Sequence, residues 1–233
     1  MKTIRDNEGS IFTTLRELPL LKGVSQSRLQ SVVGHTPMHF MKFGADEEIV
    51  APGQDCTHLK FIVNGSVRME VAGERLAASY ILHAPQVIAP DYLFGRTTKY
   101  PCRAVAISPV GIMQIAKEDY RKMLMSDQVF LFNYLNFVST NSQKGLHGIM
   151  SVAEGTLEER IALWVVSLTQ PGSTDVVLRS ERRDLYSLFG ATRSAYFTTI
   201  EHMRERGIVD FTDSHELRIL SRPALLELIT LSR

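Results

Sequence analysis

Residues 180–209 constrain the fold most strongly, because their apolar positions fit two short helices that meet at a turn. Ser180 is a natural N-cap for the first helix, which buries a short apolar face and ends before Gly190. Gly190 suits the left-handed conformation of a helix end, and Thr192 can cap a second helix that runs to about Arg206. The pattern predicts a helix-turn-helix unit.

The residues after this unit predict a wing. Residues 208–211 and 216–220 have the composition of two short strands, and the polar residues 212–215 between them have that of a turn. Pro223 then favours the first turn of a last short helix. Two helices followed by a two-stranded wing predict a winged helix that reads double-stranded DNA.

Local charge favours the same interpretation. The whole chain of 233 residues has a formal net charge of only +1, so a nucleic-acid surface must be local. After Lys144 every lysine or arginine is an arginine, whose planar fork matches phosphates and guanine edges. The alternative is a solvated helix face with ion pairs between neighbouring turns. Arginines near the two helices are Arg179, Arg182, Arg183, Arg193, Arg204 and Arg206, against the acids Glu181, Asp184, Glu201 and Glu205.

Residues 38–116 have the period of strands. Short apolar runs alternate with turn residues, which predicts a sandwich, roll or barrel. Asn64-Gly65 lies between two of these runs and predicts a hairpin, because both residues tolerate positive φ.

Residues 127–152 contain no proline and predict a long helix. Its small and apolar residues recur at alternating spacings of four and three, as in a heptad seam. Two interpretations stay open: a helix packed on its own domain, or a two-fold coiled-coil dimer interface. The seam comprises Leu131, Leu135, Val138, Ser142, Gly145, Ile149 and Val152. A capping box at Thr156 and Glu159 predicts that another helix starts there.

Other site types find little support in the sequence. Two cysteines, Cys56 and Cys102, are too few for a disulfide framework or for an iron–sulfur cluster within one chain. The histidines show no close metal-binding pairs, so we predict no metal and no cofactor. The N-terminus has no apolar signal region and no run is long enough to span a membrane, so a cytoplasmic protein is expected.

The chain resembles the Crp/Fnr family over about residues 15–230. The resemblance rests on three segments: residues 43–53, residues 59–67 and residues 190–194. It implies an α+β chain with an N-terminal cyclic-nucleotide-binding-type double-stranded β-roll (jelly roll), a long dimerisation helix and a C-terminal winged helix-turn-helix. The corresponding domains are residues 1–125, 126–152 and 153–233.

The resemblance also implies partners and contact residues. A homodimer would bind a palindromic operator, and the family contacts RNA polymerase. The family pattern reads Arg-Glu-x-x-x-Arg along the recognition helix, whereas this chain has Arg193, Ser194 and Thr198, so a different operator is expected. The implied DNA-binding residues are Arg182, Thr192, Arg193, Ser194 and Thr198.

The effector pocket departs most from the family. Cyclic-nucleotide binders of the family carry a glutamate for the ribose and an Arg-Ser/Thr pair for the phosphate. The corresponding positions here are Pro90, Tyr100 and Pro101, so the partners of the phosphate are missing. We therefore expect an effector other than cyclic AMP, of unknown identity, or no effector. Candidate pocket residues are Pro90, Tyr92, Tyr100, Cys102 and Ser142.

Together these features predict a dimeric, sequence-specific DNA-binding transcription regulator and not an enzyme. The alternative is a cupin-like β-roll enzyme or ligand carrier with a helical interaction module. That alternative needs converging histidines and carboxylates, which the sequence does not offer as close pairs.

Overall fold

The computed structural model describes residues 8–152, 155–180, 182–211 and 215–230. The chain divides into two compact units. The first comprises residues up to 68 together with residues 83–140, and the second comprises residues 69–82 together with residues 141–233. Strands β4 and β5 and helix α4 continue from one unit into the other.

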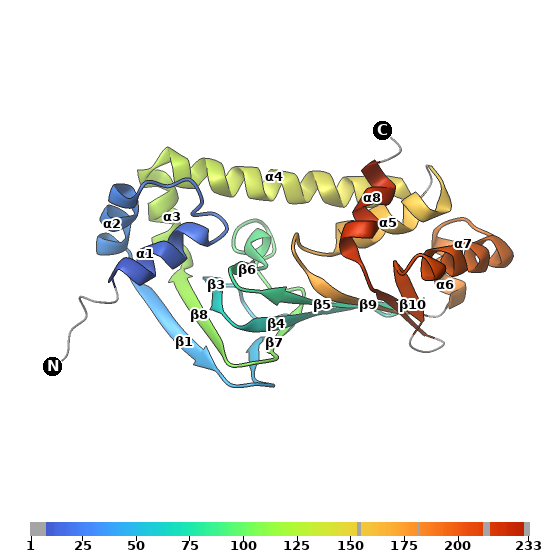
Figure 1. Cartoon of the computed structure of the whole chain (residues 1–233). Coiled ribbons are helices and arrows are strands. Elements are labelled where there is room, and N and C mark those ends of the chain that lie inside the picture. The colour runs from blue at the N-terminus through green and yellow to red at the C-terminus, as the bar shows by residue number, and fades with distance from the viewer. Residues whose placement is uncertain (1–7, 153–154, 181, 212–214, 231–233) are drawn as a thin grey trace. The chain divides into compact units, whose positions relative to one another are not determined.

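The first unit contains the predicted β-rich region (Figure 1). Its central sheet is antiparallel with the strand order β1-β8-β3-β6, and β2 pairs with β7 in the second layer, beside the start of β4. Its elements are α1 (Glu8–Glu17), α2 (Gln26–His35), β1 (Met38–Phe43), β2 (Glu48–Val50), β3 (His58–Asn64), β4 (Ser66–Ala72), β6 (Gln86–Ile88), β7 (Arg103–Ala106), β8 (Val110–Ala116), α3 (Lys117–Ser126) and the first half of α4 (Gln128–Ser151), with a short 3-10 turn, η2 (Pro90–Tyr92). Apolar side chains of β3 and β8 fill the space between the layers.

The predicted hairpin at Asn64-Gly65 is wrong. The two neighbours of β3 are β8 and β6, so β4 does not pair with it, and the turn instead leads the chain into the other layer. Gly65 has φ +80°, and a Cβ on it would lie 2.4 Å from the carbonyl oxygen of Pro109. The Asn64 side chain also stabilises the corner, because its Oδ1 accepts a hydrogen bond of 2.6 Å from the Gly111 amide. Asn64 and Gly65 do form a turn, but the turn makes a corner between the layers and not a hairpin.

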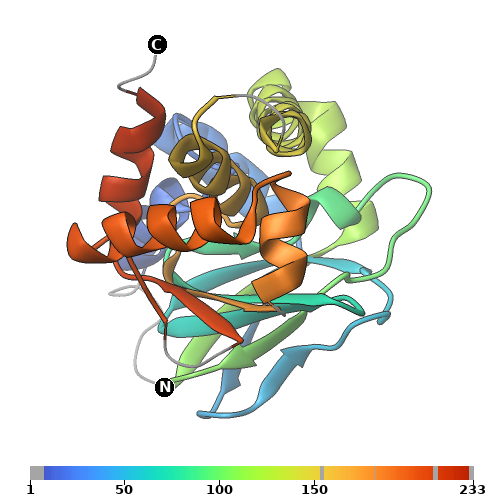
Figure 2. The ribbon, with the colours of Figure 1, turned by 90° about the vertical axis from the view of Figure 1, so that its right-hand side faces the viewer.

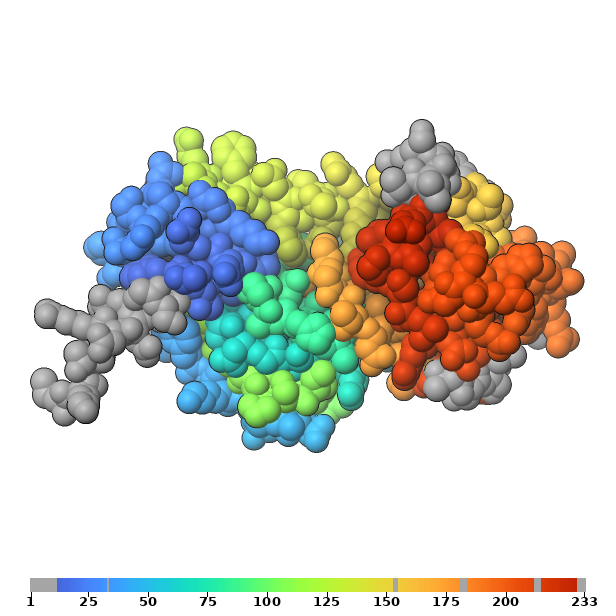
Figure 3. Space-filling view, viewed as in Figure 1, coloured from blue at the N-terminus to red at the C-terminus, as the bar shows by residue number. Residues whose placement is uncertain are grey.

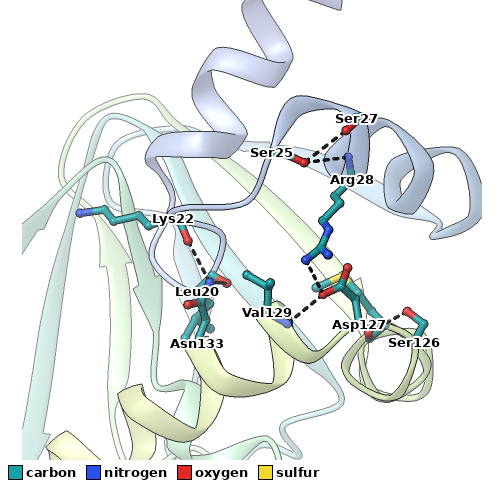
Figure 4. Close-up of polar contacts among 10 residues, drawn as sticks. Leu20, Lys22, Ser25, Ser27, Arg28, Ser126, Asp127, Val129 and Asn133 are labelled. Atoms are coloured by element: carbon teal, nitrogen blue, oxygen red, sulfur yellow. Dashed lines mark hydrogen bonds and ion pairs between the residues drawn. The ribbon is translucent and has the colours of Figure 1, made fainter.

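Polar contacts fix the N-terminal helices to the start of α4 (Figure 4). The Asn133 amide donates to the carbonyl oxygens of Leu20 and Lys22, at 3.1 and 2.9 Å. Leu20 is buried and has φ +72°, a conformation that costs energy for a residue with a Cβ. Arg28 also pairs with Asp127 at 3.3 Å. The two hydrogen bonds from Asn133 therefore hold the strained turn at Leu20 in place.

The second unit contains the predicted winged helix and an addition (Figure 1). The predicted capping box is confirmed at Thr156 and Glu159. The strand order is β10-β11-β9-β5, so β5 extends the wing sheet. The elements are β5 (Leu76–His83), the second half of α4, α5 (Leu157–Leu168), β9 (Thr174–Ser180), α6 (Arg182–Leu188), α7 (Arg193–Glu205), β10 (Val209–Phe211), β11 (Glu216–Ile219) and α8 (Arg222–Thr230). The fold class predicted from the sequence, with β-roll, long helix and C-terminal helix-turn-helix, is confirmed.

The prediction that Ser180 caps the first helix is not tested, because residue 181, between β9 and α6, lies outside the described residues. Ser180 ends β9, where it pairs with Leu76 of β5. Its hydroxyl donates to the carbonyl oxygen of Arg75 at 2.9 Å, which ties the end of β9 to the start of β5. The β-branched run at Val176 and Val177 was the local signal for this strand.

Replacing Gly65 with alanine tests the corner between the two layers. We expect Gly65→Ala to lower the free energy of unfolding by at least about 2 kcal/mol, because the new Cβ meets a backbone oxygen in addition to the positive φ. Gly53→Ala is the matched control: φ is +78° there, but nothing lies within 4 Å of the added Cβ. It should cost about 1 kcal/mol. Urea unfolding measures both, and equal losses would contradict the close contact at Gly65.

Candidate nucleic-acid interface

Helices α6 and α7 form the helix-turn-helix, and Figure 2 shows them crossing one another. Gly190 has φ +59°, as a left-handed helix end requires. The Ala191 amide donates to the carbonyl oxygen of Tyr186 at 2.9 Å, which closes the turn. Thr192 caps α7, accepting a hydrogen bond of 3.2 Å from the Ala195 amide. The roles predicted for Gly190 and Thr192 in the turn are confirmed.

Helix α7 has one buried stripe and one exposed stripe. Tyr196, Ile200 and Met203 are fully buried. The predicted base-facing residues are all exposed at the N-terminal half of the helix, namely Thr192, Arg193, Ser194 and Thr198. Arg182 begins α6, but its side chain lies outside the described residues.

Arg193 differs from the other arginines of this region in its surroundings. Its guanidinium lies 5.7 Å from the centre of the Phe197 ring, a cation–π contact on the same helix. Arg204 instead pairs with Glu201 at 2.7 Å, and Arg206 pairs with Glu158 at 2.8 Å. Among the described residues no carboxylate lies within ion-pair distance of Arg193. Its charge is therefore held in place by an aromatic ring and is available to a ligand.

Arg160 supports the turn from α5, a role that sequence reasoning missed. Its Nη1 donates to the carbonyl oxygen of Phe189 at 3.0 Å, and its Nε donates to that of Gly155 at 3.0 Å. The Phe189 ring packs edge-on against Trp164 with the ring centres 5.5 Å apart. Arg160 had no distinguishing sequence signal, since an arginine in the first turn of a helix is usually solvated.

The wing strands have the expected antiparallel register. Val209 faces Ile219, and Phe211 faces Leu217. Residues 212–214, most of the predicted turn, lie outside the described residues. Arg179 forms an ion pair with Glu216 across β9 and β11.

The apolar seam of α4 is largely exposed in the single chain. The exposed fractions of Leu131, Leu135 and Ile149 are 36%, 46% and 70%. Ser142 is exposed, and Val138, Gly145 and Val152 are half-buried. Large apolar side chains usually avoid such exposure unless a partner covers them. The pairing of this seam with a second chain stays a prediction.

The structure brings part of the predicted effector pocket together. Pro90, Tyr100 and Cys102 are buried in the first unit, and Tyr92 at the end of η2 is exposed. The hydroxyl of Tyr100 donates to the carbonyl oxygen of His58 at 3.1 Å. Ser142 belongs to the other unit. The side chain of Tyr100 is therefore already hydrogen-bonded within the unit.

Two nearby cations already form ion pairs. Lys99 pairs with Asp55 at 3.2 Å, and Arg103 pairs with Glu48 at 2.5 Å. Burial raises the pKa of Tyr100, so this phenol stays neutral and protonated at physiological pH. A cyclic phosphate would therefore lack a free cationic partner at Tyr100, Lys99 and Arg103.

The two thiols of this region are buried. Burial raises the pKa of Cys102 to about 11 and also raises that of Cys56. Both therefore remain thiols at neutral pH, which does not favour a reactive redox cysteine. Among the described residues, no group of three or more His, Cys, Asp or Glu side chains could hold a metal ion. No helix in that part of the chain has the length and apolar character to cross a bilayer.

No family model matches the chain, and no curated protein matches its sequence. Many of the solved structures that match are regulators of the Crp/Fnr type, the family that the sequence resembles, at 12–20% identity. The catabolite activator protein of Thermus thermophilus is 14% identical, with 92% of this chain and 100% of that chain covered and a TM-score of 0.49. DNR from Pseudomonas aeruginosa is 15% identical, with 97% and 99% covered and a TM-score of 0.44. A CooA variant from Carboxydothermus hydrogenoformans is 14% identical, with 89% and 92% covered and a TM-score of 0.44. The function proposed below therefore rests on the chain's own residues.

The raised thiol pKa values predict slow alkylation of the folded protein. At pH 8 the thiolate fraction of Cys102 should be about a hundredfold below that of a thiol with the ordinary pKa of 9.0. Iodoacetamide labelling, followed by mass spectrometry, should therefore be slow in the native protein and should accelerate as the pH rises towards 11. The same protein in urea is the control, where labelling should be fast. Rapid labelling of the folded protein at neutral pH would contradict the burial of these thiols.

Proposed function

We propose that this protein is a dimeric, sequence-specific DNA-binding transcription regulator. The observation that carries the proposal is the exposed stripe of α7, with Thr192, Arg193, Ser194 and Thr198 on a helix-turn-helix next to a wing. Such a helix can enter the major groove with its N-terminal residues towards the base edges.

Arg193 is assigned the main base contact. A guanidinium can donate two hydrogen bonds to O6 and N7 of guanine, and Phe197 limits the positions this side chain samples. Ser194 can donate to or accept from several bases, and the Thr198 methyl group suits the methyl of thymine. This set differs from the Arg-Glu-x-x-x-Arg pattern of the family, so we propose a different operator.

The effector is proposed to differ from cyclic AMP, or to be absent. Tyr100 is neutral and donates to the His58 backbone, whereas Lys99 and Arg103 already pair with carboxylates. A buried phosphate needs cationic and hydrogen-bonding partners, which these residues do not supply.

The dimer is proposed to form through α4. Its apolar side chains recur with the spacing of a heptad and include Leu135 and Ile149, which are exposed in the single chain. A two-fold dimer would place two copies of α7 against the two halves of a palindromic operator.

Replacing Arg193 tests DNA recognition. We expect Arg193→Ala to weaken binding to an operator selected from random DNA by about 1–3 kcal/mol and to relax one base position in each half-site. Arg193→Lys keeps the charge but loses the fork, so affinity should recover in part while the relaxed preference stays. Fluorescence anisotropy at fixed salt measures affinity, and repeated selection measures preference.

Arg121→Ala is the matched control for this test. Arg121 pairs with Glu118 in α3, so its loss should leave DNA binding unchanged. If selection yields no preferred palindrome for the wild-type protein, the proposed function is wrong. If Arg193→Ala binds as tightly as the wild type, the assignment of Arg193 is wrong.

Charged substitutions in the seam test the dimer. Leu135→Lys and Ile149→Lys should each weaken dimerisation by at least about tenfold, because a lysine at a buried seam position must lose its hydration. Sedimentation equilibrium measures the dissociation constant. His147→Lys is the control: His147 is exposed on the same helix but lies about 160° around it from Ile149. Equal effects of the three substitutions would show that the seam is not the interface.

A further inference from the structure

A cavity in the second unit lies apart from the helix-turn-helix. It has a volume of about 400 Å³ and is formed by the start of β9, the end of β11 and the first turns of α8. This volume is within the range of small-molecule sites. Figure 3 shows α8, in dark red, at the surface of this unit.

Arg222 lines this cavity, and its positive charge lies where it is unfavourable without an anion. It is half-buried at the first residue of α8, where the helix dipole disfavours positive charge. Its Nη1 donates to the neutral Thr169 hydroxyl at 3.1 Å. Among the described residues no carboxylate lies within ion-pair distance of it. Burial lowers the pKa of Arg222, in keeping with a guanidinium that has lost water without gaining a counter-ion.

Ser173 is a second, independent polar group that lacks a partner. It lines the same cavity and is 1% exposed. Its hydroxyl oxygen is buried, without a hydrogen-bond partner among the described residues. Buried hydroxyls are nearly always hydrogen-bonded, so Ser173 is an exception in the wall of this cavity.

Apolar walls complete the cavity. Leu220 and Leu226 line it, and their exposed fractions are 53% and 41%. Exposed leucines beside a half-buried cation favour a ligand that has an apolar body and one charged end. Asp175 also lines the cavity, but its carboxylate faces Arg218 at 3.8 Å.

We propose that this cavity binds a small amphipathic carboxylate. The carboxylate would pair with Arg222, and the apolar body would pack on Leu220 and Leu226. The site belongs to the DNA-reading unit and does not use the effector-pocket residues predicted in the β-roll. It goes beyond the proposed function, and its ligand binding can be measured without DNA.

Benzoate is the probe, and benzamide is its neutral control of the same shape. We expect benzoate to bind the full chain with a Kd on the order of 1 mM, as befits a ligand of this size, in saturation-transfer NMR titrations. Benzamide should bind at least about tenfold more weakly, because it lacks the charge that pairs with the guanidinium.

Two variants test the charged part and the apolar part of the site separately. Arg222→Gln removes the cation and should weaken benzoate binding by about tenfold or more. Leu226→Glu adds a negative charge, which repels the benzoate carboxylate, at an exposed position. It should weaken benzoate binding by a similar factor without disturbing the core. Arg179→Gln is the matched control, since this exposed arginine pairs with Glu216 in the same sheet, and it should bind benzoate as the wild type does.

Thermal unfolding of each variant shows whether it is folded. If Arg222→Gln does not fold, the benzoate affinity of Leu226→Glu tests the site. The proposal is wrong if wild-type protein does not bind benzoate or if benzamide binds equally well. It is also wrong if the folded variants keep the wild-type affinity. Loss of operator binding in the Arg193 variant has no bearing on these outcomes, so the two proposals can fail separately.

Discussion

The exposed stripe of α7 depends on the burial of the opposite stripe. Tyr196, Ile200 and Met203 have almost no solvent exposure, so the helix cannot rotate without exposing large apolar side chains. Because a helix repeats every 3.6 residues, this burial leaves Arg193 and Thr198 towards solvent. Arg160 adds a fixed backbone position by holding the carbonyl of Phe189 at the turn. Apolar packing therefore determines which polar groups a ligand can meet.

Much of the second unit could be predicted from local sequence. Gly190 and Thr192 each have a role that depends on a few neighbouring residues, and both roles are confirmed. Long-range contacts could not be predicted in this way. Ser180 has the composition of an N-cap, yet its hydroxyl donates to Arg75, more than a hundred residues away in sequence. The contact of Arg160 with Phe189 is likewise invisible to local patterns.

The first unit shows the same limit at a single turn. Asn64-Gly65 is a strong hairpin signal because both residues tolerate positive φ. Gly65 does adopt φ +80°, but the identity of the strand that pairs with β3 is decided by distant β8 and β6. The sequence also offered Tyr100 as a candidate pocket residue, and it is buried in this unit. Its hydrogen bond to His58 could be found only in three dimensions.

The pairing of β5 with β9 also affects how the second unit behaves towards other chains. Strand β9 has β11 on one side and β5 on the other, so its backbone amides and carbonyls face no solvent edge along the paired residues. The outer strand on the wing side is β10, which has only three residues. A short edge offers few free backbone groups to a neighbouring molecule. Strand β5 therefore protects the wing sheet from edge-to-edge aggregation, independently of any role in DNA recognition.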